Sequence, residues 1–229
     1  MNSLVLLNGS PRGEHSNTMK MLMRIAEGWE RGGDRTTCIF HLAQRDAFGH
    51  AVEAYAKADA VVLGMPLYTD SMPALVKTYI EALGSRVDIA RAEGANPILG
   101  FMIQSGFPEA LHSRLLQRYL EKLARRLGAS YAGTVVRGGG EALQSMPDEA
   151  NKKLWERLRT LGEQLALEGR FGAEEQKAVA GIERLSQLQA ALATLVTKLP
   201  ITQFYWYSRL KKNGAWKDRF AAPYGQPVR

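Results

Sequence analysis

Five short runs of apolar and β-branched residues divide the chain, and each is followed by a segment in which apolar residues recur every three or four positions. A short unbroken apolar run is typical of a strand buried on both faces, and the wider spacing is typical of a helix with one buried side. The predicted strands are 3–7, 36–40, 58–64, 96–103 and 130–137. Helices are expected at 19–26, at 51–57, after Pro73, at 111–127 and up to about residue 168.

This alternation predicts an α/β fold, in which a parallel sheet of five strands is covered by helices on both faces. Periodicity does not give the order of the strands. Within the helix at 111–127, one face is expected to carry Leu111, Leu115, Tyr119, Leu123 and Leu127. Cys38 lies inside the second strand and is expected to be a small buried side chain, since no base or cation is visibly placed to activate its thiol.

The last 60 residues follow a different pattern. Apolar residues recur every three or four positions from Val179 to Leu199, which predicts one long amphipathic helix ended by Pro200. A cluster of aromatic and basic residues follows at 201–212. We therefore divide the chain into a sheet domain, 1–169, and a C-terminal extension, 170–229.

Composition and charge narrow the function classes. An apolar share of 45% is enough for a packed core, and a single cysteine excludes a disulfide framework, a cysteine-ligated zinc site and an iron–sulfur cluster held by this chain alone. The histidines show no ligand spacing, so no metal site is expected. Residues 198–229 hold seven basic side chains and one acid, which is +6 of the net +7, so the high pI belongs to the tail and does not predict nucleic-acid binding by the whole protein. A cytoplasmic location is expected, because we find neither a secretory leader nor an apolar run long enough to span a membrane.

The loop after the first strand carries the clearest chemistry. Residues 9–18 read Gly-Ser-Pro-Arg-Gly-Glu-His-Ser-Asn-Thr and lead directly into a helix. Unpaired N–H groups at a helix start, the Arg12 guanidinium and nearby hydroxyls together form a site for a phosphate. The loop lacks the Gly-Lys-Ser/Thr ending of nucleoside triphosphatases and the Gly-x-Gly-x-x-Gly of dinucleotide turns. A second interpretation is that Ser16 or Asn17 simply caps the helix, with no ligand bound.

This loop resembles the phosphate loop of the NAD(P)H-dependent FMN reductase and NAD(P)H:quinone oxidoreductase family of flavodoxin-like flavoproteins. The stretch from Pro66 to Glu81 is also similar to that family, with Glu81 where the family often has aspartate. The resemblance implies the flavodoxin-like strand order and FMN as cofactor. It implies that the phosphate is held by the following residues: Ser10, Arg12, Ser16, Asn17 and Thr18. It implies that the flavin ring is bordered by Pro66, Leu67 and Tyr68 on one side and by Gln104, Ser105 and Gly106 on the other.

The function that this resemblance implies is an FMN-dependent oxidoreductase, which passes hydride from NADPH or NADH to the flavin and then to a quinone, a flavin or a similar small acceptor. We name no catalytic acid or base, because the flavin carries the chemistry. Two alternatives remain: a flavodoxin-type electron carrier without nicotinamide turnover, and a flavin-free scaffold that acts through its basic aromatic arm. The glycines at 138–140 could admit a substrate or partner, or could form a plain flexible turn.

For the C-terminal extension we favour packing on the core or on a second subunit of a homodimer, because aromatic side chains are strong interface anchors. The other interpretation is docking on an anionic membrane surface, where tryptophan and lysine are well placed at the headgroups.

Overall fold

A computed structural model describes residues 1–31, 33–92, 97–144, 146–197, 200–221 and 225. The chain divides into two compact units, Met1–Arg184 and Leu185–Arg229. The first unit contains the sheet and is described first.

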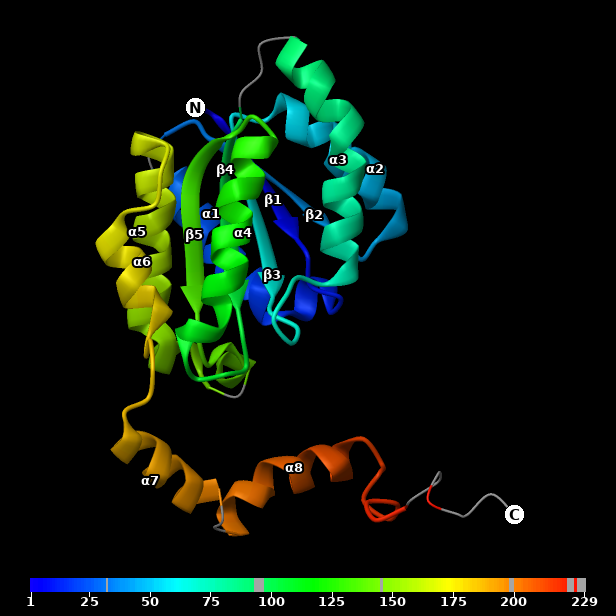
Figure 1. The fold of residues 1–229 in the computed structure, drawn as a ribbon, viewed down its shortest axis with the longest axis vertical. Helices are drawn as coiled ribbons and strands as arrows, with labels where there is room; N and C mark the ends of the chain where they lie inside the picture. Colours follow the sequence, from blue (N-terminus) through cyan, green and yellow to red (C-terminus); the bar gives the residue numbers. More distant parts are fainter. Residues whose placement is uncertain (32, 93–96, 145, 198–199, 222–224, 226–229) are drawn as a thin grey trace. The chain divides into compact units, whose positions relative to one another are not determined.

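The sheet has five parallel strands, as predicted, and the order is β2-β1-β3-β4-β5. The strands are β1 (Ser3–Asn8), β2 (Thr36–His41), β3 (Ala60–Pro66), β4 (Ile98–Gln104) and β5 (Ser130–Arg137). β3 is buried along its whole length, which explains its continuous apolar sequence. Because all the strands are parallel, their carboxyl ends meet at one edge of the sheet (Figure 1).

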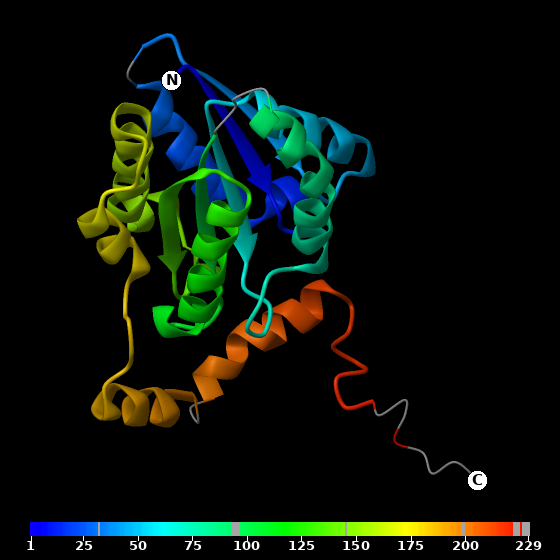
Figure 2. The same cartoon turned by 45° about the horizontal axis from the view of Figure 1, so that its top comes forward.

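Helices cover both faces of this sheet (Figures 1 and 2). One face is covered by α1 (Asn17–Glu30), α5 (Lys152–Glu168) and α6 (Ala173–Ala180), and the other by α2 (Arg45–Lys57), α3 (Ala74–Ala92) and α4 (Arg114–Arg126). Successive residues of β1 alternate between the two cores: Leu4 and Leu6 pack with α1 and α5, whereas Val5 and Leu7 pack with α2 and α3. The predicted α/β class is confirmed.

Two glycines allow α1 and α5 to pack closely. A Cβ atom at Gly28 would lie 1.9 Å from the backbone oxygen of Arg159, and one at Gly162 would lie 2.1 Å from the backbone oxygen of Ile25. No side chain fits at either position without moving a helix backbone. The position of α1, and with it the loop that precedes α1, therefore depends on this contact.

One prediction about burial is wrong, and one predicted helix face is only partly buried. Cys38 is exposed, because β2 is an edge strand and its side chains are only partly covered. In α4 the row facing the sheet is Leu116, Leu120 and Leu123, while Leu115 and Tyr119 are about half exposed and Leu111 precedes the helix. The helix carries two apolar rows, and periodicity alone does not say which one faces the sheet.

The predicted single helix over 179–199 is also wrong. α6 ends at Ala180, where Gly181 takes a positive φ of 79°, and α7 (Gln187–Thr197) begins after Ser186. The Ser186 hydroxyl accepts from the backbone N–H of Gln189, and the Gln189 side chain accepts from the Ser186 N–H, which is a reciprocal helix cap. Pro200 opens α8 (Pro200–Lys212) instead of ending a helix, because proline is well suited to the first helical turn.

The boundary between the two compact units also lies further along the chain than the predicted division at 169/170. The N–H of Phe171 donates to Ala132 of β5 at 2.8 Å, and Phe171, Val179 and Ala180 are buried in the sheet unit. Residues 170–184 therefore pack as part of that unit. None of the helices formed by the described residues combines the length and apolarity needed to cross a bilayer.

Candidate functional site

Loops from four strands are joined to one another at the carboxyl edge of the sheet. Gly9, after β1, donates from its N–H to the Gly64 oxygen of β3 at 2.8 Å, and Leu67, after β3, donates to the Gln104 oxygen of β4 at 2.8 Å. The N–H of Gly140, after β5, donates to the Ser105 oxygen at 2.7 Å. The three segments predicted to hold FMN are therefore neighbours on one edge.

Asn8, the last residue of β1, organises the first loop. Its buried side-chain oxygen accepts from the Ser10 N–H at 3.1 Å, and its Nδ2 donates to the Gly13 oxygen at 2.7 Å. Nδ2 also lies 3.0 Å from Nδ1 of His41. The same nitrogen lies 3.3 Å from the Ser16 hydroxyl oxygen, so the Asn8 side chain is surrounded by hydrogen-bonding partners from the loop and from β2. Sequence reasoning missed Asn8, although a polar residue ending a buried apolar strand is a usable signal.

Ser16 is the N-cap of α1. Its hydroxyl donates to the Gly13 oxygen at 2.7 Å and accepts from the Met19 N–H at 3.0 Å. Ser16 is therefore the cap that the sequence predicted, and its side chain holds the loop together. The first two N–H groups of the helix, at Asn17 and Thr18, have no carbonyl one turn earlier within the helix.

Buried polar atoms without partners lie at the same helix start. Oγ1 of Thr18 and Oδ1 of Asn17 are buried and make no hydrogen bond to the described residues. The Ser10 hydroxyl is also buried and accepts from the Arg12 N–H at 3.3 Å, which leaves its proton free to donate. Buried polar atoms are normally hydrogen-bonded, so unpaired ones indicate a missing partner.

Asn17 connects this helix start to the loop after β5. Its Nδ2 donates to the Gly140 oxygen at 2.8 Å, and both residues are buried. A Cβ at Gly140 would lie 2.4 Å from Oε1 of Gln104, so a side chain there would displace the Gln104 amide. The N–H groups of Gly138, Gly139 and Gly140 all donate to backbone oxygens, and the interpretation of 138–140 as a flexible turn is therefore wrong.

The segment after β3 is divided between core and surface. Pro66 and Leu67 are buried, whereas Tyr68 is 49% exposed. Tyr68 and Ser71 exchange backbone hydrogen bonds of 3.0 and 3.1 Å, and Thr69 between them has a φ of 56°. Because the N–H groups of Leu67 and Tyr68 are already used, the Tyr68 ring is the part of this segment that is open to a ligand.

The segment after β4 is similarly divided. Gln104 and Ser105 are buried, and the Ser105 N–H donates to the Arg137 oxygen at 3.0 Å. Gly106 is exposed and lies beside Glu141. Ser105 thus connects the loops, while Gly106 is the accessible residue of the pair.

One ion pair crosses the site. Nη1 of Arg12 lies 3.5 Å from a carboxylate oxygen of Glu141, and both side chains are about half exposed. The guanidinium that was predicted to bind phosphate therefore already faces an acid. Sequence reasoning missed Glu141, because only the fold brings residues 12 and 141 together.

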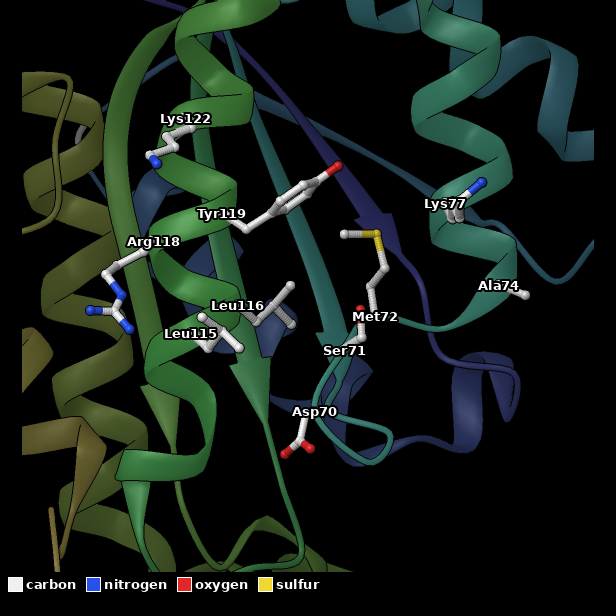
Figure 3. A pocket seen from close by; sticks show the side chains of 10 residues that line it. All are labelled: Asp70, Ser71, Met72, Ala74, Lys77, Leu115, Leu116, Arg118, Tyr119 and Lys122. Atoms are coloured by element: carbon white, nitrogen blue, oxygen red, sulfur yellow. The ribbon is translucent and has the colours of Figure 1, made fainter.

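A cavity of about 760 Å³ lies between α3 and α4, beside the loop after β3 (Figure 3). Its apolar side chains include Met72 and Leu116, and Tyr119 points across it toward Met72. Its charged side chains are Lys77, Arg118, Lys122 and Asp70. The pocket is of the size that holds a small organic molecule. Leu115 and Tyr119 of its lining belong to the helix face that was recognised in the sequence.

Comparison with known proteins agrees with the observed fold. A family model described as flavodoxin-like fold matches residues 2–86, which include the loops after β1 and β3. The protein has a flavodoxin-like fold. A search of curated protein sequences finds no match to this chain.

Solved structures share the flavodoxin-like fold at low sequence identity. The apo form of an NADH:FMN oxidoreductase is 17% identical, with a TM-score of 0.56 over 81% of this chain and 97% of that one. An FMN-dependent NADH-azoreductase from Bacillus anthracis, in complex with FMN, is 16% identical, with a TM-score of 0.54 over 72% of this chain and 100% of that one. An oxidoreductase from Corynebacterium diphtheriae is 17% identical, with a TM-score of 0.54 over 73% and 96%.

The residues at the sheet edge fit FMN in their chemistry. The Thr18 and Ser10 hydroxyls and the Arg12 guanidinium are donors suited to a phosphate, and they lie at a helix start, where backbone N–H groups lack partners within the helix. The exposed Tyr68 ring and the backbone at Gly106 are suited to a flat aromatic ring. The assignment of individual residues to the cofactor remains a prediction.

Proposed function

We propose that this protein is an FMN-dependent oxidoreductase that uses NADPH or NADH to reduce a small acceptor such as a quinone or a flavin. The observation that carries the proposal is the buried, unpartnered hydroxyl of Thr18 in the first turn of α1, next to the accessible Tyr68 and Gly106. Solved structures with this fold that are named FMN-dependent oxidoreductases support it.

In this proposal the chain binds and orients, and the cofactor supplies hydride transfer. The N–H groups of Asn17 and Thr18 and the hydroxyls of Ser10 and Thr18 hold the phosphate. Arg12 supplies the positive charge and moves away from Glu141 when phosphate binds. Ser16, Asn8 and Gln104 act indirectly, because they fix the loops that present these groups.

The cavity between α3 and α4 supports the same reaction class. It combines an apolar floor with the cations Arg118 and Lys122, which suits an anionic aromatic molecule. NAD(P)H is such a molecule, and so is a sulfonated or carboxylated acceptor. We propose that the co-substrate or the acceptor uses this pocket.

The test is a reconstitution followed by an anaerobic titration. The purified protein is mixed with FMN, freed of excess by gel filtration, and titrated with NADPH and then NADH while the visible flavin absorption is recorded. The proposal expects FMN to stay with the protein and to bleach stoichiometrically with at least one nicotinamide. A protein that keeps FMN but stays yellow is an electron carrier, and a protein that takes up no FMN is a scaffold. Either result contradicts the proposal.

Two substitutions in the pocket test its role separately from that of the cofactor site. Lys122→Ala and Arg118→Ala should raise the KM for the anionic substrate and leave the FMN affinity unchanged. Lys153→Ala, an exposed cation on α5, is the matched control. Equal KM values for all three variants would remove the pocket from the mechanism.

A further inference from the structure

The second compact unit exposes an aliphatic row on α7. Leu188, Leu192, Leu195 and Val196 are between 48% and 70% exposed. Their spacing of four, three and one residues places them on one side of the helix. The 11 residues of α7 contain no charged side chain. An uncharged helix with a bare leucine face is costly in water and calls for an apolar partner.

Aromatic and cationic side chains are gathered in α8 and in the turn that follows it. Phe204 and Trp206 are 72% and 62% exposed. Trp216 packs edge-on against Tyr207, with ring centroids 5.1 Å apart, and the Arg219 guanidinium lies 4.1 Å from the centre of its ring. Such groups of tryptophan, tyrosine and cations are typical of the boundary between lipid and water.

Charge is concentrated in the same unit. Residues 185–229 contain seven basic side chains and a single acid, Asp218, so the unit carries +6 while the other 184 residues carry +1. The described cations of α8 are Arg209, Lys211 and Lys212. A strongly positive unit with exposed leucines matches a surface that is anionic outside and apolar beneath.

We propose that the unit Leu185–Arg229 docks on an anionic lipid bilayer, with the α7 leucines at the acyl boundary and the α8 cations among the headgroups. This differs from the expectation of a dimer arm. Two copies paired through this unit would bring two +6 surfaces together, which is unfavourable. Nucleic acid would satisfy the charge but would leave the aliphatic row of α7 exposed.

The mode of binding is interfacial. None of the described helices is suited to cross a membrane, and α7 has 11 residues where a span needs about 20. The inference does not depend on the proposed redox function, since it uses no residue of the sheet edge.

The experiment is co-sedimentation of the full chain with lipid vesicles. Vesicles of phosphatidylcholine alone are compared with vesicles containing phosphatidylglycerol, at low and high salt. We expect binding to the anionic vesicles, weakening with salt, and little binding to phosphatidylcholine. Lys211→Gln with Lys212→Gln should weaken the partition roughly 30-fold, and Leu192→Asp with Leu195→Asp should abolish it.

The matched control is Lys152→Gln with Lys153→Gln, which removes the same charge from an exposed part of α5. It should bind anionic vesicles like the unaltered protein. Equal binding to both vesicle types, no binding, or an equal loss in the control would overturn the proposal. So would sedimentation velocity without lipid showing a dimer that Leu192→Asp dissociates, because the leucine row would then belong to a second copy.

Discussion

The amide nitrogen of Asn17 donates to the carbonyl oxygen of Gly140 across 2.8 Å, so that the first turn of α1 and the loop after β5 are directly connected. The two residues are 123 positions apart in sequence. This bond joins the two sides of the candidate phosphate site, and both residues are buried. The bond therefore stabilises the fold and also fixes the geometry of the site.

Replacing Asn17 with alanine removes the donor and leaves the Gly140 oxygen buried without it. We expect a loss of about 1–3 kcal/mol in the free energy of unfolding, measured by urea denaturation without FMN. Thr160→Ala is the control, because it removes an exposed hydroxyl that only donates to its own helix. If both variants unfolded at the same urea concentration as the unaltered chain, the Asn17–Gly140 bond would contribute nothing to stability.

Removing the acid opposite Arg12 should strengthen cofactor binding. In Glu141→Gln the guanidinium no longer has a competing carboxylate 3.5 Å away. Since both side chains are about half exposed, the gain is small, and we expect FMN to bind about two- to fivefold more tightly. Glu121→Gln, whose partner Arg125 lies one turn away on the solvent side of α4, should leave the affinity unchanged. Weaker binding in Glu141→Gln would mean that the carboxylate orients Arg12 instead of competing for it.

The close contact of α1 and α5 predicts that two glycine substitutions will differ strongly in their effect on stability. Gly28→Ala places a methyl group 1.9 Å from the Arg159 oxygen and should cost about 1–3 kcal/mol or more. Gly49→Ala, in α2 with no heavy atom nearby, should be neutral or stabilise by up to about 1 kcal/mol. Thermal unfolding of the two variants is the measurement. A Gly28→Ala protein with the same melting temperature as the unaltered chain would contradict this packing.

Asp59 should make stability depend on pH at the opposite end of the sheet. Its Oδ2 accepts from the N–H groups of Asn2 and Ser3 at 2.7 and 3.0 Å, and these bonds lower the pKa of the carboxyl. A lowered folded-state pKa contributes stability above the unfolded pKa of about 3.9, and this contribution is lost as the pH falls through the folded value.

Asp59→Asn should therefore be less stable than the unaltered chain at neutral pH, and the difference should shrink as the solution is acidified below about pH 4. Unfolding free energies of the variant and the unaltered chain, measured at several pH values, give the stability difference at neutral pH and its change with acidification. FMN affinity should not change, because Asp59 precedes β3 and lies away from the carboxyl edge. A difference that stayed constant with pH would exclude the carboxylate as its cause.

The five strands and the first loop could be predicted because their causes are local. β3 is an uninterrupted apolar run, and the Ser16 cap lies beside the helix that it begins. The exposed row of α4 and the exposed Cys38 could not be predicted, since both depend on which elements lie next to them. The break at Gly181 was missed because the apolar spacing continues through it, although the glycine and the Ser186 cap were visible in the sequence.

The candidate site was predicted in part for the same reason. Ser10 and Thr18 could be named as candidate phosphate ligands because they lie within one short loop. Glu141 and the Asn17–Gly140 bond depend on strand order, which hydrophobic periodicity does not contain. Ser105 was expected at the ligand, which stays a prediction, and its N–H and carbonyl connect the loops after β4 and β5.

The measurement that tests the central claim most directly is a calorimetric comparison of FMN with riboflavin, which lacks the phosphate. If the loop after β1 binds phosphate, FMN should bind at micromolar levels and riboflavin about 10- to 100-fold more weakly. Arg12→Ala should weaken FMN binding and leave riboflavin binding unchanged. Equal affinity for the two flavins, or no uptake of FMN at micromolar concentration, would contradict a phosphate site at this edge of the sheet.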